Sequence, residues 1–155
     1  MTDVPAKLKE MGFELPQTAP PLYNYVPYVI TGSLVFIAGQ IPFLNGQKMH
    51  IGRLGENMDV AAGQKAAQAC ALNILANVRD AVNGDWSRVV RCVKLGAFVN
   101  STPDFDQQSV VINGASDLIV GALGDRGKHA RFAVSAPSLP VGASVEIDAI
   151  FEIKV

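Results

Sequence analysis

The sequence predicts an α+β domain in which two helices cover one face of a β-sheet. Two long segments, residues 59–82 and 104–123, place apolar side chains at spacings of three and four residues, as amphipathic helices do. The other regular segments, residues 25–39, 88–100 and 130–153, show the short apolar runs and the period-two alternation of strands. Because strands precede, separate and follow the helices, the order is that of a split β-α-β arrangement.

The first part of the chain is predicted to be an extension of this domain. Residues 4–12 form a short helical pattern with Gly12 near its end. Residues 16–22 (PQTAPPL) follow as a proline-rich connector that favours extended backbone. We therefore expect a single domain over residues 1–155, in which residues 1–22 are an N-terminal extension with a short helix.

Three strands are predicted before the first long helix. Residues 25–31 and 34–39 are two strands that a tight Gly-Ser turn joins. The Asn-Gly pair at residues 45–46 is a strong two-residue turn signal, and it predicts a third strand over residues 48–51.

Two helices and a long strand are predicted for the middle of the chain. Asp59 can cap a helix over residues 59–82, and an Asn-Gly pair ends this helix. Residues 88–100 are rich in valine and predict a buried strand. The second helix is predicted over residues 104–123, with an aspartate near its N-terminus and a glycine after its last apolar residue.

The last part of the chain is predicted to be two strands, residues 130–136 and 145–153, around a turn. In each strand one row of alternate side chains is apolar and is expected to build the core. Arg131 and Glu146 lie on the opposite, polar rows. A planar guanidinium suits a carboxylate, and a carboxylate on a second strand can accept a proton or position water. These two residues are therefore a candidate site for a small substrate that carries a carboxylate.

Composition excludes several classes of protein. The formal net charge is −1 and no basic stripe is present, so binding of nucleic acid through its phosphates is not supported. No apolar run is long enough to span a membrane, and the N-terminus has no apolar signal region, so a cytoplasmic location is expected. Cys70 and Cys92 are too few for a disulfide scaffold, and we expect both to be reduced and buried.

Motifs of several enzyme classes are missing from the sequence. It has no phosphate-binding loop, no G-x-G-x-x-G, no H-E-x-x-H and no G-x-S-x-G. His50 and His129 are the only histidines, and neither has cysteines or acidic residues around it at the spacing of metal ligands. A zinc site or a catalytic histidine pair is therefore not expected.

Two motifs in sequence order carry a resemblance to a known family. G-Q-I-P occupies residues 39–42 after a strand, and A-R-x₇-L-P-x₄-V-E-I occupies residues 130–147. Together they resemble the RidA/YjgF family of imine/enamine deaminases, also known as L-PSP endoribonucleases, and the resemblance covers residues 25–155. It implies a chorismate mutase-like α+β fold with a mixed sheet. It also implies a homotrimer with a cleft at each subunit interface, and neither metal nor organic cofactor.

The resemblance also implies roles for individual residues. Arg131 would grip the substrate carboxylate, and Glu146 would position the hydrolytic water. Tyr25 would line the pocket, Asn113 would face the cleft, and Gly39 would let the substrate approach the backbone. Each residue also has a purely structural interpretation, such as a salt bridge, a solvated surface side chain, an aromatic edge in the core or a tight bend.

Two positions depart from the family pattern. Ala38 stands where the family often has Ser or Thr, which removes one hydroxyl from the pocket. Ala133 stands where the family often has Cys, although its backbone carbonyl can still accept a hydrogen bond from the substrate or from water.

The function predicted from the sequence is the hydrolytic deamination of reactive 2-imino and enamine acids to 2-oxo acids and ammonia. Three alternatives remain open at this point: a protein that binds 2-oxo acids without catalysis, an endoribonuclease that inhibits translation, and a chaperone-like interaction protein. The near-neutral charge and the lack of a histidine pair argue against the endoribonuclease.

Overall fold

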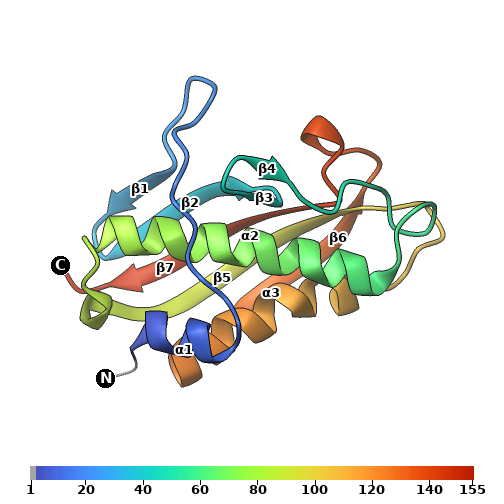
Figure 1. The fold of residues 1–155 in the computed structure, drawn as a ribbon. Coiled ribbons are helices and arrows are strands. Elements are labelled where there is room, and N and C mark those ends of the chain that lie inside the picture. The colour runs from blue at the N-terminus through green and yellow to red at the C-terminus, as the bar shows by residue number, and fades with distance from the viewer. Residues whose placement is uncertain (1–2) are drawn as a thin grey trace.

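A computed structural model describes residues 3–155 and confirms the α+β fold. One sheet has five strands in the order β1-β2-β7-β5-β6; β5 and β6 run parallel and the other neighbours run antiparallel, so the sheet is mixed. Helices α2 and α3 lie beside each other across one face of this sheet (Figure 1). The elements are α1 (Val4–Glu10), β1 (Tyr28–Thr31), β2 (Leu34–Gln40), β3 (Phe43–Leu44), β4 (Gln47–Lys48), α2 (Val60–Ala81), β5 (Val89–Asn100), α3 (Gln108–Leu123), β6 (Ala130–Ala136) and β7 (Val145–Ile153).

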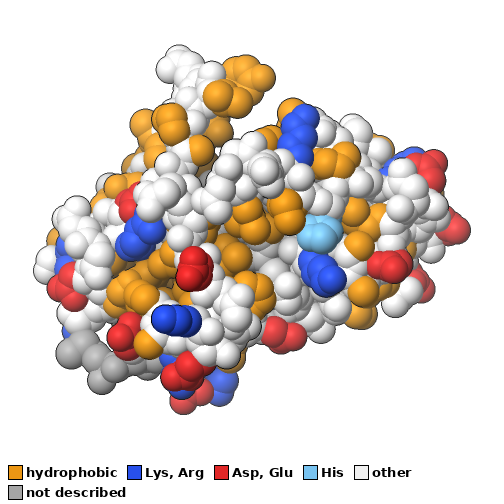
Figure 2. All heavy atoms as spheres, viewed as in Figure 1, with side chains coloured by type: hydrophobic (Ala, Val, Ile, Leu, Met, Phe, Trp, Pro, Cys, Tyr) orange, Lys and Arg blue, Asp and Glu red, His pale blue; other side chains and the backbone are white. Residues whose placement is uncertain are grey.

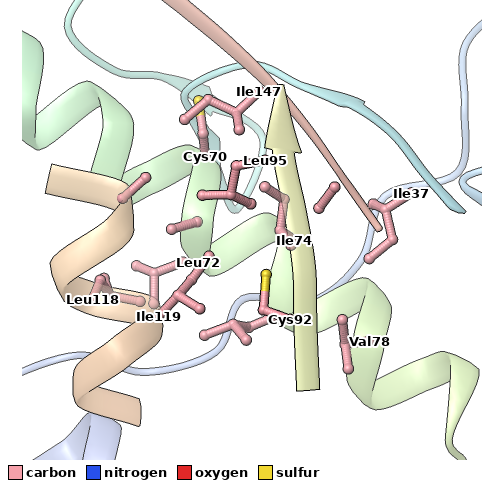
Figure 3. Packing of buried hydrophobic residues seen from close by; sticks show 14 of the residues in the cluster. Ile37, Cys70, Leu72, Ile74, Val78, Cys92, Leu95, Leu118, Ile119 and Ile147 are labelled. Carbon is pink, nitrogen blue, oxygen red and sulfur yellow. The ribbon is translucent and has the colours of Figure 1, made fainter. Parts of the chain in front are cut away.

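The core lies between the sheet and the helices. Cys70, Ile74 and Val78 of α2 are buried in this core together with Cys92 and Leu95 of β5 (Figure 3). Both cysteines are free and buried, as expected. Burial raises the pKa of the Cys70 thiol, and it raises the pKa of Cys92 to about 12, so these thiols are inert packing groups in the folded protein.

The predicted ends of α2 are confirmed. The Asp59 side chain accepts a hydrogen bond from the Ala62 backbone nitrogen at 2.8 Å, as an N-cap does. Asn83 and Gly84 follow the helix with φ angles of 54° and 77°, the left-handed conformation that ends helices.

The third predicted strand and the second predicted helix have different bounds in the structure. Asn45 and Gly46 do form the expected turn, between β3 and β4, but the strand predicted over residues 48–51 ends at Lys48 because His50 has a φ of 51° and leaves the extended conformation. The second helix begins at Gln108 rather than at residue 104. The backbone nitrogen of Phe105 donates to the Thr102 carbonyl at 3.2 Å, so Asp104 lies in a turn, and Asp106 lies in the irregular segment between this turn and the helix.

The N-terminal segment is held on α2 before it leaves the body of the molecule. The Thr18 hydroxyl donates to Asp80 at 2.6 Å, and Arg79 donates to the Pro16 carbonyl at 3.3 Å. The chain then rises as a projecting loop (Figure 1), and apolar side chains cover part of this projection (Figure 2). Leu22 and Tyr23 are 90% and 80% exposed. The first strand, predicted from residue 25, begins only at Tyr28.

The last two strands are not neighbours, because β5 lies between β6 and β7. The prediction for β7 is confirmed, since Val145, Ile147 and Ala149 are buried. The prediction for β6 is wrong: its apolar row is not part of this chain's core, since Phe132 and Val134 are 37% and 44% exposed on the face of the sheet that the helices leave open. None of the helices within residues 3–155 combines the length and the apolar character that crossing a membrane requires.

Candidate functional site

A cavity of 570 Å³ lies between the N-terminal segment, the end of β2 and the side of α2. Tyr25, Gly39 and Glu146, three of the predicted site residues, line this cavity. Ala38 lines it as well, at the position where the family often has a hydroxyl. Half of the predicted site is therefore brought together in one place.

The backbone of Gly39 and the carboxylate of Glu146 lie against each other. The pairing of β2 with β7 is irregular between Ile37 and Gln40, so Gly39 lies in a bulge. A Cβ atom at position 39 would lie 2.5 Å from Glu146 Oε1, which is too close for any other residue to fit without a shift. The glycine of the G-Q-I-P motif therefore makes room for the glutamate.

Glu146 is half-buried and has a carboxylate neighbour. Partial burial, and then the charge of Asp148 on the same row of β7, raise the pKa of Glu146 above its ordinary value. A carboxylate with a raised pKa is a stronger base, and its acid form is present closer to neutral pH. Glu146 is therefore suited to exchanging protons with a ligand in the cavity.

Two asparagines of α2 also line the cavity, and the sequence prediction did not include them. Asn73 Nδ2 donates to the carbonyls of Ile41 and Phe43 at 3.2 and 2.6 Å, which holds the chain that leaves β2. Asn77 Nδ2 donates to the Asn73 carbonyl at 2.9 Å. The sequence did contain a signal, since two asparagines four residues apart follow the apolar residues Ala66 and Cys70 on the same side of the helix.

Arg131 does not line this cavity. It projects from β6 toward α3, where its Nη1 donates to Ser116 Oγ at 3.0 Å and its Nη2 donates to the Ser109 carbonyl at 2.9 Å. It pairs in the sheet with Leu95, whose side chain is buried under the helices, whereas Glu146 pairs with Phe98 on the open face. Within one chain, Arg131 and Glu146 are therefore on opposite faces of the sheet and do not form one site.

A chain of hydrogen bonds orients Arg131, and the sequence prediction did not include it. His129 Nδ1 is 2.6 Å from the Gly127 carbonyl, so this nitrogen carries the proton, and the Nε2 of a neutral ring then accepts from the Ser116 hydroxyl at 3.0 Å. The lone pairs of Ser116 Oγ are left to accept from Arg131. This arrangement fixes one end of the guanidinium and points to a positioning role for His129.

The two remaining predicted residues lie close to Arg131. Asn113 is exposed on α3 between Ser109 and Ser116, at spacings of four and three residues, so it is on the helix face that Arg131 crosses. Ala133 follows Arg131 on the same row of β6 and packs partly against the core. We call Arg131, Ala133 and Asn113 the arginine group, and Tyr25, Gly39 and Glu146 the cavity group.

The open face of the sheet carries aromatic side chains between these two groups. The Phe132 ring crosses Gly96, where a Cβ would lie 2.9 Å from the ring, and it packs edge-on against Phe98 with centroids 5.6 Å apart. Lys94 Nζ is 5.4 Å from the same ring. Phe36 and Phe98 are 41% and 43% exposed. Large apolar side chains thus lie exposed across several strands of this face.

Within residues 3–155, no three His, Cys, Asp or Glu side chains gather as metal ligands would.

Comparison with known proteins identifies the family. Residues 5–152 match the family described as "YjgF/chorismate mutase-like, putative endoribonuclease". Protein TCP17 of Trypanosoma cruzi is 46% identical over 152 residues, which cover 97% of this chain and 94% of that protein. The crystal structure of Atu1372 from Agrobacterium tumefaciens is 51% identical with a TM-score of 0.92, over 97% of this chain and 92% of that one. A candidate endoribonuclease from Shewanella oneidensis is 31% identical with the same TM-score, over 97% and 99% of the two chains. The chain therefore belongs to the YjgF/chorismate mutase-like family.

Proposed function

We propose that the protein hydrolyses reactive 2-imino and enamine acids to 2-oxo acids and ammonia, at a site that two subunits share. The observation that carries this proposal is the separation of Arg131 from Glu146 onto opposite faces of one sheet. Each group is incomplete in a single chain, because the described residues that line the cavity include Glu146 but no lysine or arginine, and Arg131 does not line this cavity.

Self-association through the open face would join the two groups. The exposed aromatic and aliphatic side chains of β2, β5 and β6 are the kind of surface that another subunit covers. The proposed assembly is a homotrimer in which the arginine group of one subunit lies at the cavity of the next. Such a head-to-tail contact closes into a ring and repeats the site at every interface.

Arg131 binds the substrate in this proposal. An imine or enamine derived from an amino acid carries a carboxylate beside its C=N carbon. The guanidinium receives that carboxylate in a two-pronged contact and fixes the reacting carbon. The bonds to Ser116 and to the Ser109 carbonyl hold the side chain against α3, so little conformational freedom is lost on binding.

Glu146 acts as the general acid and the general base of the reaction in this proposal. In its acid form it protonates the enamine carbon, which gives an iminium ion, and it then accepts a proton from the water that attacks the C=N carbon. The proton returns to the nitrogen of the tetrahedral adduct. As ammonia leaves, the Glu146 carboxylate takes the proton of the adduct's hydroxyl group, so a 2-oxo acid remains and the acid form of Glu146 is restored. The Ala133 carbonyl is the proposed second acceptor for that water.

Two more distant solved structures share the fold of this chain. RidA from an Antarctic Psychrobacter is 26% identical with a TM-score of 0.58, over 91% of this chain and 100% of that one. TdcF from Escherichia coli, 20% identical with a TM-score of 0.61 over 90% and 94% of the chains, was solved with bound serine. At that identity the likeness establishes a common fold only, so the proposal for a carboxylate ligand rests on Arg131.

A second candidate function is binding of 2-oxo acids without turnover. Ala38 favours it, because this wall of the cavity offers a methyl group where a hydroxyl could assist the chemistry. Binding of 2-oxobutanoate with no acceleration of imine hydrolysis would support it. The family description also names RNA cleavage, and cleavage that persists in the Arg131→Ala/Glu146→Gln double variant would come from a different site.

A coupled assay tests the main proposal. An enzyme that releases an iminium ion from threonine supplies 2-iminobutanoate, and its hydrolysis is followed with and without this protein. Arg131→Ala should remove the acceleration, since losing its charged hydrogen bonds costs roughly 2–4 kcal/mol, on the order of a hundredfold in rate. Arg91→Ala is the matched control, because Arg91 also donates to a backbone carbonyl, that of Lys128. Equal turnover in both variants would refute the proposal.

A further inference from the structure

The guanidinium of Arg131 is held by neutral acceptors only. Its Nη1 donates to Ser116 Oγ and its Nη2 donates to the Ser109 carbonyl, which uses two of its five N–H groups. Among the described residues no carboxylate forms an ion pair with Arg131, and its side chain is partly exposed. The positive charge is therefore oriented but not neutralised, and an anion can bind to it.

The direction of the Ser116 hydroxyl determines whether Arg131 has an acceptor there. A hydroxyl has one hydrogen and two lone pairs. Because His129 Nδ1 donates to the Gly127 carbonyl, the Nε2 of the neutral ring receives the Ser116 hydrogen, and the lone pairs of Oγ are left for Arg131. Without the imidazole, the hydroxyl can rotate and donate to water or to a carbonyl of its own helix.

The far end of this chain of hydrogen bonds is fixed by packing. A Cβ at Gly127 would lie 2.6 Å from the Ile119 carbonyl oxygen, so the Gly127 backbone lies directly against α3. Arg126 Nη1 donates to the Val89 carbonyl at 2.8 Å, which holds the same segment on β5. The imidazole of His129 is therefore oriented by backbone that cannot shift easily, as a precisely placed binding group requires.

We propose that Ser116 and His129 are positioning residues that set the affinity of Arg131 for the carboxylate of the substrate. A guanidinium binds a carboxylate through two parallel N–H···O bonds, so its plane as well as its position must be correct. A side chain that is already held loses less conformational freedom on binding than a mobile one. This inference rests on the proposed function, because it concerns the residue that binds the carboxylate.

The two residues act in series, which predicts how their variants compare. Ser116→Ala and His129→Leu should each weaken the binding of 2-oxobutanoate about tenfold, the effect of one hydrogen bond to a charged group. The double variant should bind no more weakly than Ser116→Ala, because both substitutions break the same path. His129→Gln should bind almost as wild type does, since its amide oxygen can replace Nε2 as the acceptor for the Ser116 hydroxyl.

Calorimetric titration of the full-length protein with 2-oxobutanoate measures these affinities, and thermal unfolding establishes that each variant folds. In the coupled assay, Ser116→Ala should raise KM for 2-iminobutanoate by a similar factor and leave kcat near that of wild type. This separation is expected because the carboxylate contact is the same before and during the reaction. A purely structural role of Ser116 would not produce it.

The order of the Arg131 side chain can also be measured without any ligand. Nitrogen-15 relaxation of Arg131 Nε should show a more mobile guanidinium in Ser116→Ala and in His129→Leu, and wild-type order in His129→Gln. The guanidinium of Arg79, which donates to Asp80 and to the Pro16 carbonyl, is the control and should not change.

Two results would overturn the inference and leave the proposed function standing. One is unchanged affinity in Ser116→Ala when Arg131→Ala abolishes binding, and the other is a His129→Gln variant that binds as weakly as His129→Leu. If Arg131→Ala itself leaves the affinity for 2-oxobutanoate unchanged, the proposed carboxylate site fails, and this inference fails with it.

Discussion

The Gly39 backbone lies so close to the Glu146 carboxylate that a Cβ at position 39 would be 2.5 Å from Oε1. Gly39→Ala should therefore displace the carboxylate and lower kcat for 2-iminobutanoate. A second substitution, Glu146→Asp, shortens the acidic side chain and removes the clash. The double-mutant cycle in kcat/KM should show a coupling of about 0.5–3 kcal/mol between the two sites. Additive effects would mean that the contact does not matter for the reaction.

The raised pKa of Glu146 predicts how stability depends on pH. Since burial and Asp148 raise this pKa in the folded protein, the folded state binds the proton more readily than the unfolded chain does. The protonated Glu146 carboxyl therefore stabilises the folded state fully when the pH is below the pKa of this group in the unfolded chain. This stabilisation is lost as the pH rises through the higher pKa of the group in the folded protein. Glu146→Gln should therefore raise Tm at neutral pH and have little effect near about pH 4. Glu152→Gln, on the same row of β7, is the control, and a lower Tm of Glu146→Gln at neutral pH would contradict this account.

The open face of the sheet is predicted to hold the oligomer together. Phe132→Gln removes the ring that packs against Phe98 and adds a polar amide to this face. At low micromolar protein concentration, size-exclusion chromatography with light scattering should give a lower average molar mass for this variant than for the wild-type protein. Met11→Gln, a substitution at a similarly exposed apolar residue that follows α1, should not change the mass. The proposed interface would be wrong if Phe132→Gln also left the mass unchanged.

The contact between α2 and α3 depends on a glycine. A Cβ at Gly114 would overlap the Gln64 backbone carbonyl, which cannot move without the helix, so Gly114→Ala should destabilise the fold by about 1–3 kcal/mol. Gly121 is the control in the same helix, because its Cβ would meet only the flexible end of the Met11 side chain. Chemical denaturation should show a clearly larger loss for Gly114→Ala, and equal losses would contradict the role of this contact.

Much of the fold could be predicted because local patterns determine it. The spacing of apolar residues in α2, its Asp59 cap and the alternation in β7 are each set by neighbours in the sequence. The start of α3 was predicted too early because an aspartate near the start of an apolar pattern looks like a cap, whereas Asp104 lies in the turn that ends at Phe105.

The geometry of the site could be predicted only in part. The G-Q-I-P and V-E-I motifs indicate Gly39 and Glu146, and the structure places both at one cavity. The position of Arg131 depends on which strands pair, and nothing local in residues 130–153 shows that β5 lies between β6 and β7. Alternation shows that Phe132 and Arg131 face opposite ways, but not which of them faces the helices.

Mixing two inactive variants tests most directly whether the site forms between subunits. The Arg131→Ala variant keeps Glu146, and the Glu146→Gln variant keeps Arg131. A site in a mixed oligomer is therefore complete only when an Arg131→Ala subunit supplies the glutamate and a Glu146→Gln subunit supplies the arginine. After joint refolding of equal amounts, the account predicts about a quarter of wild-type deaminase activity, the random share of such pairings in a closed ring. A mixture that forms hybrid oligomers, shown by mass spectrometry, and stays as inactive as its components would contradict it.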